Sequence, residues 1–271
     1  MKLLFGSKDR KVLSIIFCIS ILYWILFIGI SHYKAHPLGL YTQIPLIIIP
    51  IFGGLVGFYK SRQWGGWRSV MGKAILGLSL GMVVWGFALG MWTYYTVLGT
   101  AVPYPSLADF VFIWSPILWM YGLLELFRVI GARFSFRNLK ESFVGFGITS
   151  FVGIVAYLFL VVIAHGNAIG TAKESIEQLF FDYAYTVEMI AIVTLVGALF
   201  VLSRKYLGGK YKRTILLLFL GFFVHFIAIF FFVKTTGDNT YFNGNIADIL
   251  FTVAVYFESL GIINLDIKLF E

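Results

Sequence analysis

The sequence has few of the residues on which secreted domains and soluble proteins depend. It has one cysteine, Cys18, so no intrachain disulfide and no cysteine-based metal site can form. Charged residues make up 13% of the chain, and soluble domains carry about twice that share. A disulfide scaffold is therefore excluded, and so is a chain made mainly of soluble domains.

Motifs of several enzymes and cofactor proteins are also missing. There is no H-E-x-x-H and no glycine-rich phosphate loop. No lysine lies in the middle of an apolar run to form a retinal Schiff base, and His225 alone lies mid-membrane, so a bis-histidine haem lacks its second ligand. His32 and His36 have i,i+4 spacing, but Pro37 weakens a helix there. We expect no catalytic residues, no metal and no cofactor, and therefore no enzyme.

What the chain does have is apolar sequence, 60% of its residues with a mean hydropathy of +0.90. A helix needs about 20 apolar residues to span a bilayer. The runs of this kind lie at 12–30, 41–59, 74–98, 109–127, 143–164, 181–202, 214–233 and 246–265. The sequence predicts an all-α polytopic bundle of eight transmembrane helices, forming a single integral membrane domain over residues 1–271.

The basic residues predict the orientation of these spans. Of the 21 lysines and arginines, 18 fall at the N-terminus, in every second loop or after the last run. The opposite loops hold only Lys34, Lys173 and Lys234. Basic loops stay in the cytoplasm during insertion, which predicts a multi-pass protein of the cell membrane with both termini cytoplasmic. The net charge of +8 is then a topology signal, and no nucleic-acid partner is expected.

Two parts of the chain match each other, which predicts an internal repeat. Leu107-Ala108-Asp109 and Ile246-Ala247-Asp248 each begin a run, 139 residues apart. Further matches at offsets of 139 or 140 are Phe112 with Phe251, Gly122 with Gly261, Leu126 with Leu265, Lys73 with Arg213, Gly81 with Gly221 and Trp85 with His225. We expect two parallel four-helix units, at about 12–130 and 143–266, with polar sites between them.

Glycines at small-xxx-small spacing predict which helices pack most closely. The run at 74–98 carries Gly77 with Gly81 and Gly86 with Gly90, and the run at 41–59 carries Gly53 and Gly57. Such pairs allow helix backbones to approach each other. We expect these two helices to be central.

Acids and tyrosines gather at the outer ends of the expected spans. Ser106 with Asp109 has capping-box spacing, and Asn245 with Asp248 repeats the arrangement. Two readings stay open for these acids: structural helix caps, or two carboxylates facing a shared outer pocket that binds a cation or amine. The tyrosines have a second reading too, as the interfacial aromatic belt.

Two acids lie deeper, where an ionisable side chain usually marks function. Glu188 follows Asp182 and Tyr185 at three-residue spacing, so these side chains share one face of a helix. Glu258 is expected to pair with His225, as a proton relay, a pH-sensitive latch or a satisfied polar contact between helices. Glu125, near the cytoplasmic edge, is expected to pair with Arg128.

These motifs resemble a known family. Tyr94-Tyr95, Pro103 through Phe110 and Asn243 through Asp248 are similar to the multi-pass membrane input domain that precedes histidine kinase and diguanylate cyclase modules in archaea and bacteria. The resemblance implies a sensor whose last helix feeds a cytoplasmic output domain, with Asp109, Asp248 and nearby tyrosines in an outer pocket and an acid at Glu188. The sequence ends at Glu271 without such a domain, so we expect a separate signalling partner.

The favoured hypothesis is a stand-alone membrane sensor that binds a small polar ligand in an outward-facing acidic and aromatic pocket. The expected pocket residues are Tyr95, Tyr104, Asp109, Asp182, Tyr185, Glu188, Tyr241 and Asp248. The alternatives are a small-solute or proton-coupled transporter and a structural subunit of a membrane complex. All three place the chain in the lipid bilayer, and two of them need a partner protein.

Overall fold

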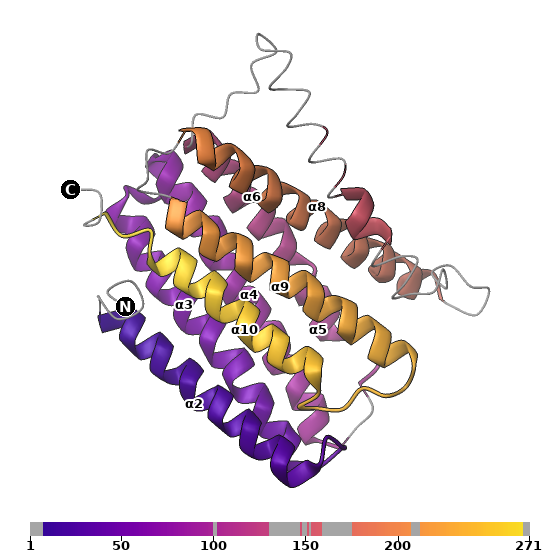
Figure 1. Ribbon diagram of the computed structural model, residues 1–271. Helices are drawn as coiled ribbons and strands as arrows, with labels where there is room; N and C mark the ends of the chain where they lie inside the picture. Colours follow the sequence, from indigo (N-terminus) through magenta and orange to yellow (C-terminus); the bar gives the residue numbers. More distant parts are fainter. Residues whose placement is uncertain are drawn as a thin grey trace.

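The computed structural model describes residues 8–99, 102–129, 147, 151, 153–158, 175–206 and 212–267. Within these residues the secondary structure is helical (Figure 1). The elements are α2 (Lys8–Ser31), η1 (Pro37–Thr42), α3 (Gln43–Gln63), η2 (Gly66–Arg68), α4 (Val70–Val97), α5 (Leu107–Phe112), α6 (Trp114–Val129), α8 (Ile176–Tyr206), α9 (Lys212–Gly237) and α10 (Ile246–Ile263). The expected all-α class is confirmed for the described chain.

Seven helical stretches in this part of the chain are long and apolar enough to cross a membrane, as an integral membrane protein requires. They are Lys8–Ser31, Pro37–Gln63, Val70–Val97, Leu107–Val129, Ile176–Phe200, Lys212–Gly237 and Ile246–Ile263. Each coincides with one expected run. The eighth, at 143–164, lies mostly outside the described residues.

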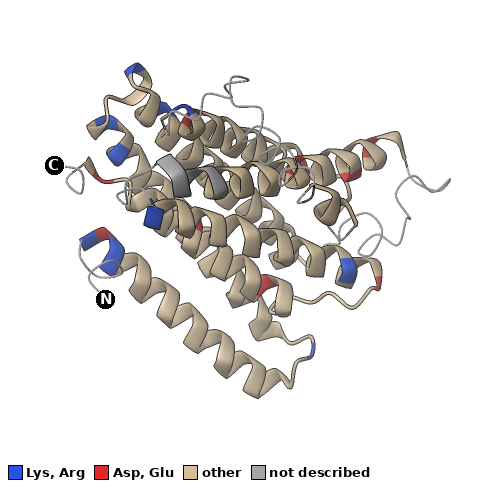
Figure 2. Cartoon of the chain, turned by 45° about the horizontal axis from the view of Figure 1, so that its top comes forward, with Lys and Arg blue, Asp and Glu red and all other residues tan. Residues whose placement is uncertain are grey.

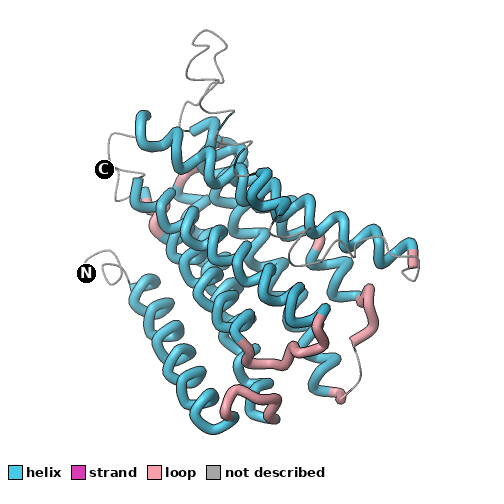
Figure 3. The backbone as a smooth tube through the Cα atoms, turned by 45° about the vertical axis from the view of Figure 1, so that its right-hand side comes forward, coloured by secondary structure: helices cyan, strands magenta, loops and turns pink. Residues whose placement is uncertain are grey.

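The long helices run side by side, and the described loops lie at their two ends (Figure 3). We call the end at which α2 begins and α10 ends the near end, and the opposite one the far end. Of the seven stretches, Ile246–Ile263 is the most buried, with 67% of its most apolar window inside the protein, and Lys8–Ser31 the least, with 17%. α10 is therefore an interior helix, although it follows all the other described helices in sequence.

Glycines bring α3 against both of its neighbours. A Cβ placed on Gly53 would collide with Ser259 of α10, and one placed on Gly57 would collide with Ser79 of α4. The Ser259 hydroxyl donates a hydrogen bond to the carbonyl of Ile49, 3.3 Å away. α3 thus packs between α4 and α10, in agreement with the expectation from its glycine spacing.

Two helix pairs, α4 with α6 and α9 with α10, also pack through glycine. A Cβ on Gly122 of α6 would lie 2.6 Å from the backbone nitrogen of Leu78 in α4. A Cβ on Gly261 of α10 would lie 2.8 Å from the side chain of Leu218 in α9. Gly122 and Gly261 are 139 positions apart, and Leu78 and Leu218 are 140 apart, so matching positions make matching contacts.

Polar contacts tie the near ends of α2, α3 and α10 together. Arg10 donates to Asn264 at 2.8 Å, Lys60 forms an ion pair with Asp266 at 2.6 Å, and the Trp64 indole donates to the Leu265 carbonyl at 2.8 Å. Figure 2 shows many of the basic residues near this end, where both termini lie. The end of α10 is therefore held by side chains from α2, α3 and the turn after α3.

Candidate functional site

Five of the eight expected pocket residues come together at the far end. The Tyr104 hydroxyl donates to Asp182, and the Tyr185 hydroxyl donates to Asp109, 3.0 Å from Oδ1 and 3.1 Å from the backbone carbonyl. Glu188 lies one turn further along α8, close enough to Tyr185 for their charges to interact. We call Tyr104, Asp109, Asp182, Tyr185 and Glu188 the α5–α8 cluster.

The cap at the start of α5 positions this cluster. Oδ2 of Asp109 accepts hydrogen bonds from the Ser106 backbone N–H at 2.6 Å and from the Ser106 hydroxyl at 2.7 Å. The expected capping box is therefore present. Because the cap uses Oδ2, the other oxygen of Asp109 faces Tyr185. Asp109 is both a helix cap and part of a polar cluster, so the two readings do not exclude each other.

Glu188 lies at the inner end of the cluster. The residue is only 8% exposed, and its Oε2 atom has no hydrogen-bond partner among the residues that the structure describes. A buried carboxylate oxygen without a donor costs free energy, so such atoms call for an explanation. Here the residue lies one turn of α8 from Tyr185, which bonds to Asp109.

A second cluster, the α3–α10 cluster, consists of Gln43, Tyr241, Gly244 and Asp248. Asp248 is 2% exposed and accepts from the Gln43 side-chain amide at 2.7 Å, the Gly244 N–H at 2.6 Å and the Tyr241 hydroxyl at 3.0 Å. Burial and the neighbouring Asp248 raise the pKa of Tyr241 well above its usual value. The cluster thus holds one buried carboxyl with three donors.

The start of α10 differs in detail from the start of α5. The Asn245 side chain accepts from the N–H groups of Ala247 and Asp248, as a helix cap should. Asp248, however, reaches back to Gly244 instead of to the backbone of Asn245. The reason is local: Gly244 has a φ of +89°, a left-handed conformation that turns its N–H toward the carboxylate.

The two acids that begin α5 and α10 bind different partners. Asp109 bonds to a side chain of α8 and Asp248 to a side chain of α3. Tyr95 lies in neither cluster but lines an apolar groove on α4. Gln43 was missed from the sequence, where the one signal was a single amide before an apolar run.

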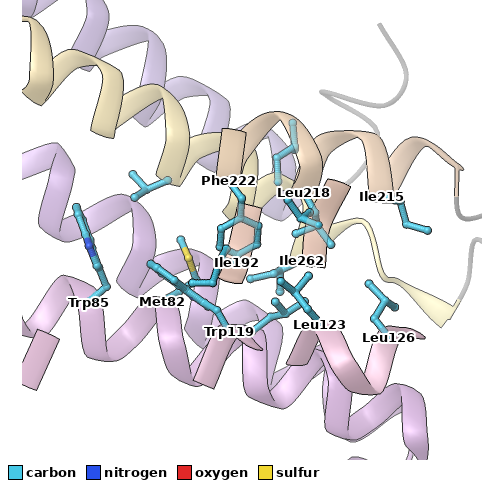
Figure 4. Close-up of a cluster of buried hydrophobic side chains, with 14 of the residues drawn as sticks. Met82, Trp85, Trp119, Leu123, Leu126, Ile192, Ile215, Leu218, Phe222 and Ile262 are labelled. Atoms are coloured by element: carbon cyan, nitrogen blue, oxygen red, sulfur yellow. The ribbon is translucent and has the colours of Figure 1, made fainter. Parts of the chain in front are cut away.

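His225 and Glu258 pair in the interior, as expected. Nδ1 of His225 lies 3.0 Å from Oε1 of Glu258, and the two side chains are 1% and 0% exposed. The imidazole contacts Trp85, Trp119 and Phe251 edge-on, with ring centroids 5.2 to 5.5 Å away. Figure 4 shows Trp119 within the surrounding apolar cluster and Trp85 at its edge. The pair is therefore a polar contact inside an aromatic shell.

The same place in the first helix pair is apolar. Trp85 and Trp119 lie 140 and 139 positions before His225 and Glu258. A Cβ on Gly81 would collide with Trp119, and a Cβ on Gly221 would lie 2.6 Å from the Glu258 side chain. Matching glycines thus pack against an indole in one pair and a carboxylic acid in the other.

The remaining expected polar residues have local partners. Arg128 donates to Glu125 at 2.7 Å, as expected for an ion pair within one helix. Nδ1 of His36 accepts from the Leu38 N–H at 3.2 Å and caps η1. Among the described residues, no three His, Cys, Asp or Glu side chains are grouped so that they could hold a metal ion.

One serine of α4 lies in a sequence pattern that some hydrolases use. Gly77 to Gly81 reads G-x-S-x-G, which in those enzymes forms a sharp strand-to-helix turn. Here the pattern lies within α4, where Ser79 is fully buried and donates to the Ile75 carbonyl at 2.6 Å. The pattern therefore serves helix packing, because its serine is not presented to a substrate.

No protein-family model, curated protein or solved structure matches this sequence.

Proposed function

We propose that the chain is a membrane sensor that binds a small cationic ligand, such as an organic amine, at the α5–α8 cluster. The observation that carries the proposal is the buried Oε2 of Glu188, which has no hydrogen-bond partner among the described residues and lies one turn of α8 from the Tyr185–Asp109 hydrogen bond. Carboxylates accept hydrogen bonds from ammonium groups, and tyrosine rings attract cations. An amine between Glu188 and the far end would supply the missing donor.

The architecture that we propose for the sensor has eight spans in two parallel repeats, at about 12–130 and 143–266. The equivalent glycine contacts of α4 with α6 and of α9 with α10 support the repeat. The distribution of lysine and arginine supports an orientation in the cell membrane with cytoplasmic termini and with the far end outside.

Signal transmission in this proposal runs through α10. Its far end is held by the α3–α10 cluster, and its near end by Arg10, Lys60 and Trp64. Glycine contacts also hold the second half of α10 closely against α3 and α9. A shift at the outer end therefore moves the inner end as well, where a separate partner protein would detect it.

A binding experiment tests the ligand site. The full chain in lipid nanodiscs would be titrated by calorimetry with mono-, di- and polyamines and with guanidinium, Na⁺ and K⁺. We expect saturable binding of at least one organic amine, and about tenfold weaker binding in Glu188→Gln and Tyr185→Phe. Tyr183→Phe is the matched control, because Tyr183 is an exposed tyrosine of the same helix. Binding that is equally strong in all variants, or absent with every probe, contradicts the proposal.

Orientation is tested by cysteine labelling. With Cys18 replaced by alanine, Lys34→Cys should react with a membrane-impermeant maleimide on intact cells. Arg62→Cys should react only after permeabilisation. The reverse pattern would place the far end in the cytoplasm.

A proton-coupled transporter is the second candidate, and the buried His225–Glu258 pair favours it. The aromatic shell around the pair weighs against it, because Trp85, Trp119 and Phe251 are not a path for a polar solute. Ion-driven uptake into proteoliposomes that is lost in Glu258→Gln would favour the transporter over the sensor.

A further inference from the structure

A groove runs between α3 and α4 toward the far end of the bundle. Its volume is about 460 Å³, within the range of roughly 300–1,000 Å³ found for small-molecule pockets. It is lined by Ile47, Ile51, Gly86, Phe87, Gly90, Met91, Tyr94, Tyr95 and Leu107. Apart from the hydroxyls of Tyr94 and Tyr95, these side chains are apolar.

Glycine makes the groove. A Cβ on Gly86 would lie 2.8 Å from the Ile51 side chain, so α3 closes the floor at this position. A Cβ on Gly90, one turn further toward the far end, would meet nothing within 4 Å. Gly77 and Gly81 of the same helix pack against α6. The space beside Gly90 is therefore open, whereas neighbouring helices occupy the space beside Gly77, Gly81 and Gly86.

The position of the groove indicates what fills it. Its walls belong to three stretches that are long and apolar enough to cross a membrane, and Phe87, Tyr94 and Leu107 are each about 60% exposed. In a bilayer, hydrocarbon chains surround such a surface. Tyr94 and Tyr95 lie in the last turn of α4, where tyrosines sit at headgroup level. The walls carry no charged side chain for the carboxylate of a free fatty acid.

We propose that the groove binds one acyl chain of a bilayer phospholipid, with its headgroup beside Tyr94 and Tyr95. The chain packs over Gly90 and against Ile47, Ile51 and Phe87. This site is separate from the α5–α8 cluster and does not depend on the proposed ligand. It does reach Leu107, the first residue of α5, two positions before Asp109.

The test fills the groove from within. Gly90→Leu projects a side chain into open space, so it occupies the site without a clash. Gly29→Leu is the matched control, because Gly29 of α2 is also a helical glycine with nothing within 4 Å of its Cβ position. Both changes introduce a better helix former, so thermal melts followed by circular dichroism should stay at or above the wild-type melt.

The readout is the full chain in nanodiscs of phosphatidylethanolamine and phosphatidylglycerol doped with a phosphatidylcholine that carries a diazirine in mid-chain. After irradiation, we expect peptide mass spectrometry to find the lipid on residues 86–95. This adduct should fall about tenfold in Gly90→Leu and remain in Gly29→Leu. Native mass spectrometry should likewise retain one phospholipid on the wild type and on Gly29→Leu, and none on Gly90→Leu.

Three outcomes overturn the proposal. Equal labelling of α2 and α4 would mean annular lipid without a held chain. Undiminished labelling of residues 86–95 in Gly90→Leu would place the lipid elsewhere. A dimer in native mass spectrometry that Gly90→Leu dissociates would make the groove a contact between two copies.

Discussion

The His225–Glu258 pair allows a quantitative prediction, because its counterpart in the first helix pair is apolar. Replacing His225 with phenylalanine removes the hydrogen bond to Oε1 of Glu258, and Glu258→Leu removes the same bond from the imidazole. Both groups are at least 99% buried, so solvent cannot replace the lost contact. We expect each single substitution to lower the free energy of unfolding by about 1–3 kcal/mol.

The double substitution should cost less than the sum of the two. It removes both polar groups and approximates the Trp85–Trp119 arrangement, in which an aromatic shell encloses aromatic side chains. We expect a coupling energy of about 1–2 kcal/mol, near the upper values for hydrogen bonds between membrane helices. Glu258→Gln keeps a hydrogen-bonding group and should cost less than Glu258→Leu.

Unfolding in mixed micelles, followed by tryptophan fluorescence, measures these values, because Trp85 and Trp119 contact the pair directly. The conclusive quantity is the coupling energy from the double-mutant cycle. Additive costs would refute the reasoning, since they would mean that neither group stabilises the other.

Three further predictions concern packing and the far end. Gly122→Ala should lower stability by about 1–3 kcal/mol, because its Cβ would press on the backbone of α4, whereas Gly29→Ala should be neutral or slightly stabilising in the same thermal assay. Gln43→Leu should lower the free energy of unfolding by about 1–3 kcal/mol because it removes a donor from buried Asp248, and Gln43→Glu should lower it further. Folded Tyr241 keeps its proton where the unfolded chain loses it, so stability that is present below about pH 10 is lost as pH rises further. Tyr241→Phe should reduce this alkaline loss by the equivalent of one proton, measured as the slope of unfolding free energy against pH.

Each of these has a result that contradicts it. A stable Gly122→Ala variant would mean that α4 and α6 separate easily. An unaffected Gln43→Leu variant would mean that Asp248 needs only its other two donors. An unchanged alkaline slope in Tyr241→Phe would assign the proton to another tyrosine.

The spans were predictable because their signal is simple. A run of about twenty apolar residues is stable in lipid as an α-helix. The seven described stretches coincide with the runs that hydropathy predicts. The pairing of His225 with Glu258 was predictable for a similar reason. Two buried polar groups in neighbouring helices have few other partners.

The helix that each outer acid contacts was not predictable from the spacing of residues in the sequence. Asp109 and Asp248 occupy equivalent sequence positions, and their partners come from α8 and α3, which are the second spans of the two proposed repeat units. Which helix lies opposite each acid depends on packing across the whole bundle, and the residues near each acid in the sequence do not indicate it. The groove at Gly90 was not predictable either, because a glycine in the sequence does not indicate whether a helix or lipid lies beside it.

The burial of α10 has a consequence for biogenesis. Among the described helices it leaves the ribosome last, yet it occupies an interior place between α3 and α9. The earlier helices must therefore remain incompletely assembled, with Gln43 and Lys60 short of their final partners Asp248 and Asp266, until synthesis is nearly complete. A nascent chain halted before residue 246 would display these polar groups to lipid, which marks it for membrane chaperones and quality-control proteases.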